Sequence, residues 1–202
     1  MVGAILPTMS SAATLSRVVV LAGGRSRRLG RDKLAAELGA TTVLDSLLDS
    51  LAHVQSGVPV TVTGPTRPTR QPVTWRIESP PGGGPVAGIC AGLVGLDDSD
   101  TVAVLAGDLP FGAPALEPLV VALGDTRMDA AIGVDPSGAD QQLLGAYRVG
   151  PLRRAVGADV AGRSVRSLLI RLSVVRVPLS ARCCLDVDTP ADLEAARRLA
   201  PS

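Results

Sequence analysis

A pair of glycines and a cluster of cations follow the first apolar run of the sequence. Residues 18–33 read VVVLAGGRSRRLGRDK, in which the apolar run leads into Gly23 and Gly24 and then into four arginines, one lysine and one acid. Glycines permit a tight turn and a close approach of the backbone to a ligand because they carry no Cβ. Successive amides in such a turn form a concavity that binds anions. Arg28 could then meet phosphate oxygens as a planar fork and Lys33 as a point charge, so the pattern predicts a polyphosphate site.

Two better-known phosphate-binding loops do not fit this segment. Lys33 does not directly follow a glycine and is not followed by Ser or Thr, as the Walker loop requires, and the first apolar run lacks G-x-G-x-x-G. A turn with a solvated basic surface is the alternative interpretation. The glycine pair, the preceding apolar run and the Asp32-Lys33 step favour a ligand site.

Three aspartates could hold a divalent cation near such a phosphate. Asp108 directly follows the apolar run TVAVLAG, and Asp186 and Asp188 form the segment DVDTP. Mg²⁺ is bound through one or two carboxylates together with substrate phosphates. We expect Asp108 to be a ligand, the alternative being a turn acid before Pro110. Asp188 is either a second metal carboxylate or a residue that helps Thr189 begin a helix, and Asp186 is expected to give structural support. In a strand, positions 186 and 188 would share a face.

Alternating strands and helices must position these side chains. The apolar patterns predict strands at 17–22, 58–63, 73–77, 101–108, 129–134, 143–149, 173–179 and 183–187, and helices at 41–54, 86–96, 115–123, 151–157, 164–172 and 189–200. Uninterrupted apolar strands that alternate with helices are typical of an α/β fold with a parallel sheet covered on both faces. In such sheets, ligands bind beyond the carboxyl ends of the strands.

Composition narrows the class of protein. The chain has 202 residues, 46% of them hydrophobic, with a formal net charge of +1. We expect a disordered leader at 1–16 and a single domain at 17–202. The near-neutral charge argues against a nucleic-acid partner, and no apolar run is long enough to predict a membrane span. Three cysteines without framework spacing favour reduced thiols in a cytoplasmic protein.

Five segments, taken in order, resemble one enzyme family. LAGGRSRRLGRDK resembles the nucleotidyltransferase signature L-A-G-G-x-S-x-R-M-G-x-D-K, most closely that of the molybdenum cofactor guanylyltransferases, with Leu29 in place of Met. PPGGGPVAGICAGL resembles the family's P-G-x-G-P-L-A-G loop and helix, and VAVLAGDLPF its V-x-x-C-D-[TM]-P strand. QQLLGAYR and LDVDTPADL resemble two later family segments. The match spans about residues 17–200.

The resemblance implies a three-layer, Rossmann-like nucleotidyltransferase fold with a mostly parallel central sheet and helices on both faces. It implies Mg²⁺-dependent transfer of GMP from GTP to the phosphate of molybdopterin, with release of pyrophosphate. The implied catalytic residues are Arg28, Lys33 and Asp108, and the implied metal ligands are Asp108 and Asp188. The implied nucleotide-binding residues are Leu21, Ala22, Gly23, Gly24, Ser26, Lys33, Thr63, Glu78, Gly84 and Asp108. We expect a cytoplasmic monomer or weak homo-oligomer.

Departures from the family pattern keep alternatives open. Glu78 is one methylene longer than the family's base-contacting aspartate, and Thr63 or Gly64 stands where the family has asparagine. Aspartates at 186 and 188 replace two asparagines, as in related branches that include cytidylyltransferases of the same pathway. The alternatives are a nucleotidyltransferase that uses CTP or another NTP with a different phosphorylated small-molecule acceptor, and a non-catalytic nucleotide-binding adapter for cofactor insertion.

The residues that would face the acceptor are less clearly marked. Gln141 and Gln142 fall where the family places its acceptor-facing segment. Several arginines could also meet an anionic acceptor, although each alone is more often a solvated helix residue: Arg148, Arg153, Arg154, Arg163 and Arg166.

Overall fold

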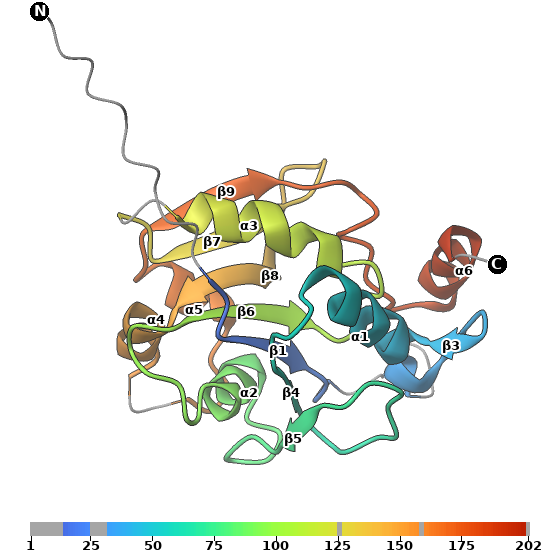
Figure 1. Cartoon of the computed structure of the whole chain (residues 1–202), viewed down its shortest axis with the longest axis horizontal. Helices are drawn as coiled ribbons and strands as arrows, with labels where there is room; N and C mark the ends of the chain where they lie inside the picture. The colour runs from blue at the N-terminus through green and yellow to red at the C-terminus, as the bar shows by residue number, and fades with distance from the viewer. Residues whose placement is uncertain (1–13, 25–31, 125–126, 158–159, 201–202) are drawn as a thin grey trace, which may run out of the picture.

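The computed structural model describes residues 14–24, 32–124, 127–157 and 160–200. A seven-stranded sheet in the order β5-β4-β1-β6-β8-β7-β9 forms its centre (Figure 1). The strands are β1 (Arg17–Leu21), β4 (Val60–Thr63), β5 (Thr74–Arg76), β6 (Thr101–Ala106), β7 (Ala130–Val134), β8 (Asp140–Arg148) and β9 (Val174–Pro178). β1, β4, β5 and β6 are parallel, β9 is parallel to β7, and β8 is antiparallel to β6 and β7. The predicted α/β class with a mostly parallel sheet is confirmed.

Helices cover both faces of this sheet. They are α1 (Val43–Val54), α2 (Pro85–Gly92), α3 (Leu116–Leu123), α4 (Val149–Val156), α5 (Val165–Leu169) and α6 (Pro190–Leu199), with short 3₁₀ turns η1 (Lys33–Ala35) and η2 (Ala113–Ala115). Val18 and Val20 of β1 face α1 and α3, whereas Val19 faces the opposite side, with α2, α4 and α5. Successive side chains of a strand point to opposite faces of the sheet, and both faces of β1 are covered by helices. An uninterrupted apolar run is therefore needed to bury the strand on both sides.

Glycines in α2 permit close packing against the sheet. A Cβ at Gly92 would lie 2.4 Å from the Val19 side chain, and one at Gly88 would lie 3.1 Å from Thr63 Oγ1. A larger residue at Gly92 would collide with β1. The close packing of α2 against β1 therefore offsets the free-energy cost of placing glycines in a helix.

The C-terminal helix packs outside the main layers. α6 lies beside the small hairpin of β2 (Glu37–Leu38) and β3 (Thr41–Thr42), at the edge of the molecule beyond α1 (Figure 1). A separate buried cluster that includes Phe111, Val187 and Leu193 holds it there. The predicted strand at 183–187 is absent: this segment forms a turn followed by chain without regular secondary structure. The Val187 amide donates instead to the Asp108 carbonyl at 3.0 Å, so the segment crosses the end of β6 rather than joining the sheet.

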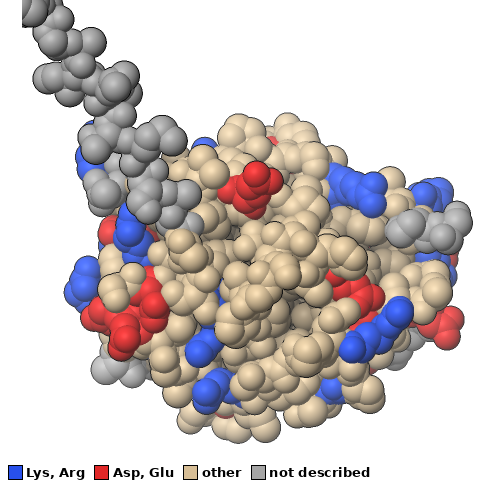
Figure 2. Space-filling model, in the orientation of Figure 1, with Lys and Arg blue, Asp and Glu red and all other residues tan. Residues whose placement is uncertain are grey.

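Charged side chains of both signs are interspersed on the face shown in Figure 2, where no continuous basic surface is seen among the described residues. Most of this face, over α1 and α3, is uncharged. Among the described residues, no helix combines the length and the apolar character needed to cross a membrane.

Candidate functional site

The carboxyl ends of β1, β4, β5 and β6 surround a cavity of about 410 Å³, called here the main cavity. Its walls include eight of the residues predicted to bind nucleotide: Leu21, Gly23, Gly24, Lys33, Thr63, Glu78, Gly84 and Asp108. Parallel strands end at one edge of the sheet, and this arrangement brings together residues far apart in the sequence. Ala22, the ninth, is fully buried under the turn, where its amide donates to the Thr63 carbonyl at 2.7 Å.

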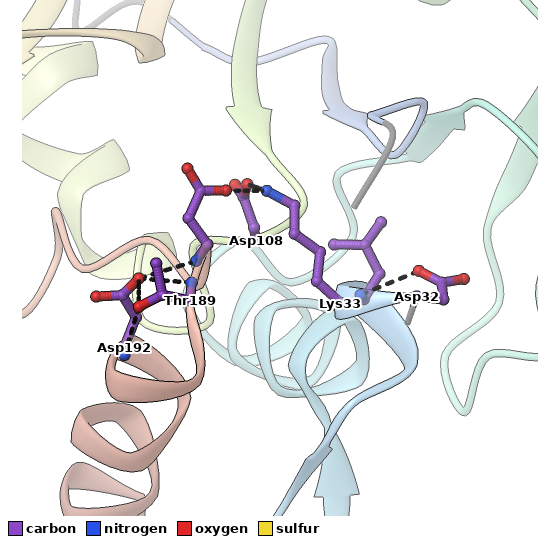
Figure 3. Close-up of polar contacts among 7 residues, drawn as sticks. Asp32, Lys33, Asp108, Thr189 and Asp192 are labelled. Carbon is purple, nitrogen blue, oxygen red and sulfur yellow. Dashed lines mark hydrogen bonds and ion pairs between the residues drawn. The ribbon is translucent and has the colours of Figure 1, made fainter. Parts of the chain in front are cut away.

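Lys33 joins two of the predicted metal carboxylates. Its ammonium donates to Asp108 Oδ2 and, at 2.6 Å, to Asp188 Oδ1. Figure 3 shows the Lys33 side chain extending from the start of η1 toward Asp108, on the side away from Asp32. The start of η1, the end of β6 and the start of α6 therefore converge on one ion-pair cluster.

The electrostatic surroundings keep Lys33 charged. Partial burial alone would lower its pKa, but the carboxylates of Asp108 and Asp188 outweigh that effect and raise the pKa above its ordinary value of 10.5. Lys33 is also the only lysine in the sequence, in which the remaining basic residues are 19 arginines. A compact ammonium on a flexible stem can transfer from carboxylates to phosphate oxygens without the planar geometry that arginine requires.

The carboxylates fit a hard divalent cation. Asp108 Oδ2 accepts from Lys33, whereas Asp108 Oδ1 is buried and has no hydrogen-bond partner among the described residues. An unpaired buried carboxylate oxygen is unfavourable unless a further ligand satisfies it. No cluster of three or more His, Cys, Asp or Glu side chains suited to a metal occurs in the described part of the chain. Mg²⁺ bound by one or two carboxylates together with substrate phosphates needs no such cluster.

The start of α6 positions Asp188. Thr189 caps the helix, Pro190 occupies its first turn and Asp192 completes a capping box. Asp192 Oδ2 accepts from the amides of Asp188 and Thr189 at 3.2 and 2.7 Å (Figure 3). One carboxylate thus caps the helix and fixes the backbone of the residue that contacts Lys33.

Replacing Asp192 with alanine is expected to lower the free energy of unfolding by about 1 kcal/mol at pH 7, because the half of the capping box that the Asp192 carboxylate supplies is lost. Partial burial alone would raise the pKa of Asp192, but hydrogen bonds from Thr189 and from backbone amides hold the pKa below its ordinary value of 3.8. A lowered folded-state pKa adds stability above the unfolded-state pKa, and this stability is lost as the pH falls through the folded-state value. The difference between wild type and variant should therefore narrow below pH 3.8.

Urea unfolding of both proteins between pH 2.5 and 7 measures this difference. Glu194→Ala is the matched control, since Glu194 is an exposed acid on the same helix that pairs only with Arg197 among the described residues. A loss for Asp192→Ala no larger than for this control would contradict the capping role.

Glu78 lies against the glycine turn in the wall of the main cavity. This residue is only 9% exposed, and its Oε1 accepts from the Gly82 amide at 3.1 Å. The same atom would lie 3.3 Å from a Cβ built on Gly23, so any side chain there would crowd Glu78. Thr63, 2% exposed, has a hydroxyl with no hydrogen-bond partner among the described residues. Together they give the main cavity a fixed carboxylate and an unused hydroxyl.

A second hollow of about 380 Å³, called here the side hollow, adjoins the main cavity across Asp108. Gln141, Gln142, Ser164 and Asp186 line it. β8 begins at Asp140, so the two glutamines belong to the strand rather than preceding it. Because β8 is antiparallel to β6, its first residues reach the edge of the sheet at which β6 ends. Partial burial, together with the neighbouring carboxylates of Asp108 and Asp188, raises the pKa of Asp186.

Three of the arginines considered for an acceptor have other partners. Arg148 donates to the carbonyls of Met128 and Leu123, at 2.9 and 3.0 Å. Arg153 pairs with Asp98 and with carbonyls after α2, and Arg163 donates to the carbonyls of Val156 and Ala155. Of the five, Arg166 lines a groove together with Asp140 and Gln142, two residues that also line the side hollow.

Some predicted residues lie outside the described part of the chain, and one described residue was not predicted. Arg28 and Ser26 fall within residues 25–31, which the structure does not describe. Arg67, from the Pro-rich loop after β4, donates to the carboxylate of Asp32 beside Lys33. The position of this loop after a parallel strand was the available signal, but nothing in the sequence distinguished Arg67 from Arg70.

Comparison with known proteins agrees with this arrangement. The model of the MobA-like NTP transferase domain matches residues 18–175. A molybdenum cofactor guanylyltransferase of Rhizobium leguminosarum bv. trifolii is 33% identical over 201 residues, covering 89% of this chain and 90% of that protein. A probable molybdenum cofactor guanylyltransferase of Mycolicibacterium paratuberculosis is 33% identical over 187 residues, covering 88% of this chain and 92% of that protein.

A solved structure shows the same fold. The crystal structure of molybdopterin-guanine dinucleotide biosynthesis protein A from Archaeoglobus fulgidus superposes with a TM-score of 0.70 at 25% identity. The match covers 91% of this chain and 97% of that one. The resemblance read from the five sequence segments is confirmed.

Proposed function

Because this chain belongs to the family of MobA-like NTP transferases and is a nucleotidyltransferase, we propose that it transfers GMP from GTP to the phosphate of a molybdopterin cofactor and releases pyrophosphate. The observation that supports this most is the meeting of Lys33, Asp108 and the glycine turn at one cavity. A polyanionic ligand that carries a divalent cation would use both the Lys33 ammonium and the unpaired carboxylate oxygen of Asp108.

The chain's own contribution is to bind the triphosphate and neutralise it. Amides of Gly23 and Gly24 approach the phosphates, and the Lys33 ammonium transfers to them from the two aspartates. Arg28 is assigned to the same task by the sequence signature. Neutralisation of the charge that grows on the leaving pyrophosphate is the main catalytic effect expected of such a site.

Asp108 and Asp188 would hold Mg²⁺, which when bound supplies a Lewis acid and a clamp for the phosphate oxygens. The unpartnered Oδ1 of Asp108 supports this assignment. Asp188 contributes from the start of α6, where the capping box fixes its backbone.

Glu78 is the proposed reader of guanine. Guanine presents two adjacent donors on its Watson–Crick edge, and a carboxylate can accept from both. Oε1 is anchored by the Gly82 amide, and none of the hydrogen bonds within the described residues uses Oε2. Thr63 adds a buried hydroxyl on the same cavity, while backbone groups at Leu21, Ala22 and Gly84 would complete the base and ribose pocket.

The side hollow is the proposed acceptor site. It shares Asp108 with the main cavity and offers amide groups from Gln141 and Gln142. An oxygen of the acceptor phosphate attacks the α-phosphorus in line, a new P–O bond forms, and the bond between the α-phosphorus and the pyrophosphate oxygen breaks. The protein positions the two reactants, and no covalent enzyme intermediate is needed.

Two alternatives remain, and the aspartates at 186 and 188 in place of asparagine favour the first of them. The first is an enzyme that uses CTP or another NTP with a different phosphorylated acceptor. The second is a nucleotide-binding adapter without turnover, although the intact contact between Lys33 and Asp108 favours catalysis. We place the protein in the cytoplasm, as a monomer or weak homo-oligomer.

Release of pyrophosphate from each of the four NTPs, with molybdopterin and Mg²⁺, tests the proposal. We expect turnover with GTP and at least about 100-fold lower kcat/KM with CTP, since the buried carboxylate of Glu78 would be left unpaired by a base with the wrong edge. Turnover with CTP but not GTP would assign the protein to the cytidylyl branch. Tight GTP binding without pyrophosphate release, with molybdopterin present, would favour the adapter.

A further inference from the structure

Arg67 connects three backbone and side-chain groups at the edge of the main cavity. Its Nε donates to Asp32 Oδ2 at 2.6 Å, and its Nη1 donates to the carbonyls of Ala22 and Pro65 at 3.1 and 2.8 Å. The side chain is only 16% exposed, so these contacts are partly shielded from water. Ala22 precedes the glycine turn and Asp32 precedes Lys33, so one guanidinium holds residues on both sides of the segment 23–31.

The contact with Asp32 continues to Lys33. Asp32 is the N-cap of η1: its Oδ1 accepts from the Leu34 amide at 3.2 Å while its Oδ2 accepts from Arg67. The Asp32 carboxylate is therefore held at both oxygens. Its orientation sets the backbone of η1, from which Lys33 reaches Asp108 and Asp188.

The loop that carries Arg67 lies directly against the glycine turn. A Cβ built on Gly64 would be 2.7 Å from both the carbonyl carbon of Ala22 and the nitrogen of Gly23, and Gly64 has a φ of +134°. This close approach requires glycine. Pro65 and Pro68 flank the arginine, and proline also restricts the residue before it, so little backbone freedom is lost when Arg67 makes its contacts.

We propose that Arg67 is a positioning residue for nucleotide binding. By joining the Ala22 carbonyl to the Asp32 carboxylate, it holds the Gly23 amide and the base of Lys33 in the arrangement that receives the triphosphate. This inference rests on the proposed function of the main cavity, and it adds a residue outside the family signature quoted above. Arg67 acts through Ala22 and Asp32 rather than through the reacting atoms.

Two measurements test this role in the full-length protein. For Arg67→Ala, hydrogen exchange followed by mass spectrometry should show faster exchange in peptides that cover Ala22–Gly24 and Lys33–Leu34, without any nucleotide present. The KM for the NTP that the wild type uses should rise about 10-fold, as expected for the loss of a charge-assisted hydrogen bond, while kcat changes by less than about threefold. Arg67→Lys, which keeps the charge but loses the fork, should restore part of the KM.

Arg70→Ala is the matched control. Arg70 belongs to the same loop, is 60% exposed and lies 3.8 Å from Asp49, on α1. It should leave both exchange and KM unchanged. Asp32→Ala should raise KM by about as much as Arg67→Ala. The double variant should have a KM close to that of either single variant, because both substitutions break the same contact between Arg67 and Asp32.

Failure of the inference and failure of the proposed function give different results. If the wild type prefers an NTP other than GTP, the exchange result and the KM for that NTP still test Arg67. Unchanged exchange and unchanged KM in Arg67→Ala would overturn the positioning role. A raised KM with unchanged exchange would also overturn it, since Arg67 would then contact the nucleotide directly.

Discussion

Replacing Asp108 with asparagine is expected to lower kcat/KM for pyrophosphate release by on the order of 10²–10³-fold, the range found when one electrostatic contact to the transition state is removed. Asp108 is the charged side chain among the residues that line both the main cavity and the side hollow, so it lies where nucleotide and acceptor would meet. Its Oδ1 is buried and without a hydrogen-bond partner among the described residues. Asparagine keeps the volume but removes the charge that would hold a divalent cation.

The control separates loss of function from loss of fold. Asp98→Asn removes an acid that is 65% exposed and pairs with Arg153, away from both cavities, and should leave kcat/KM unchanged. Circular dichroism should show that Asp108→Asn stays folded, because Lys33 retains Asp188 as a partner. Activity of a folded Asp108→Asn within about threefold of wild type would remove Asp108 from the reaction, since its electrostatic contribution would then be too small to matter.

Lys33→Met should lower kcat/KM by about 100-fold, mainly through a higher KM for the NTP, because a phosphate contact made by a charged group is lost. The same change leaves Asp108 and Asp188 without the ammonium that now lies between them. In the absence of nucleotide, the variant should therefore bind Mn²⁺ more tightly than wild type, as measured by electron paramagnetic resonance of free Mn²⁺. A higher KM for the nucleotide together with tighter binding of Mn²⁺ would show that the Lys33 ammonium can leave the two aspartates, rather than forming a purely structural ion pair with them.

The single lysine of the sequence makes this prediction observable in the wild type. Protein labelled with ¹⁵N-lysine carries one lysine side chain, so its ammonium resonance reports on Lys33 alone. Addition of GTP and Mg²⁺ should shift that resonance as the ammonium leaves the carboxylates. Lys33→Arg keeps the positive charge but changes the shape of the side chain. Comparing it with Lys33→Met therefore separates the effect of the lost charge from the effect of the changed shape. Weaker Mn²⁺ binding by Lys33→Met than by wild type would contradict the expected transfer of the Lys33 ammonium from the carboxylates to the nucleotide.

Much of the fold could be predicted from local patterns. The apolar runs that became β1 and β6 are buried on both faces, and such runs are typical of a mostly parallel sheet covered by helices. The last helix was marked by its own capping residues, Thr189 and Asp192, which act within one turn. The main cavity was also predictable, because residues after parallel strands share an edge of the sheet.

What could not be predicted depends on contacts between distant segments. The segment 183–187 has residues typical of a strand, yet no neighbouring strand pairs with it, and Val187 packs with Phe111 and Leu193 instead. Arg67 contacts a carbonyl 45 positions earlier in the sequence, a contact that no local pattern encodes. The antiparallel pairing of β8 with β6 likewise determines that Gln141 and Gln142 line the side hollow.

A crystal structure of the protein with GTP and Mn²⁺, in which the metal is located by its anomalous scattering, tests the central claim most directly. The account predicts one Mn²⁺ bound to Asp108 and to the triphosphate, with the Lys33 ammonium on a phosphate oxygen and guanine beside Glu78. A nucleotide bound elsewhere, with the Lys33 contacts to Asp108 and Asp188 unchanged, would contradict it.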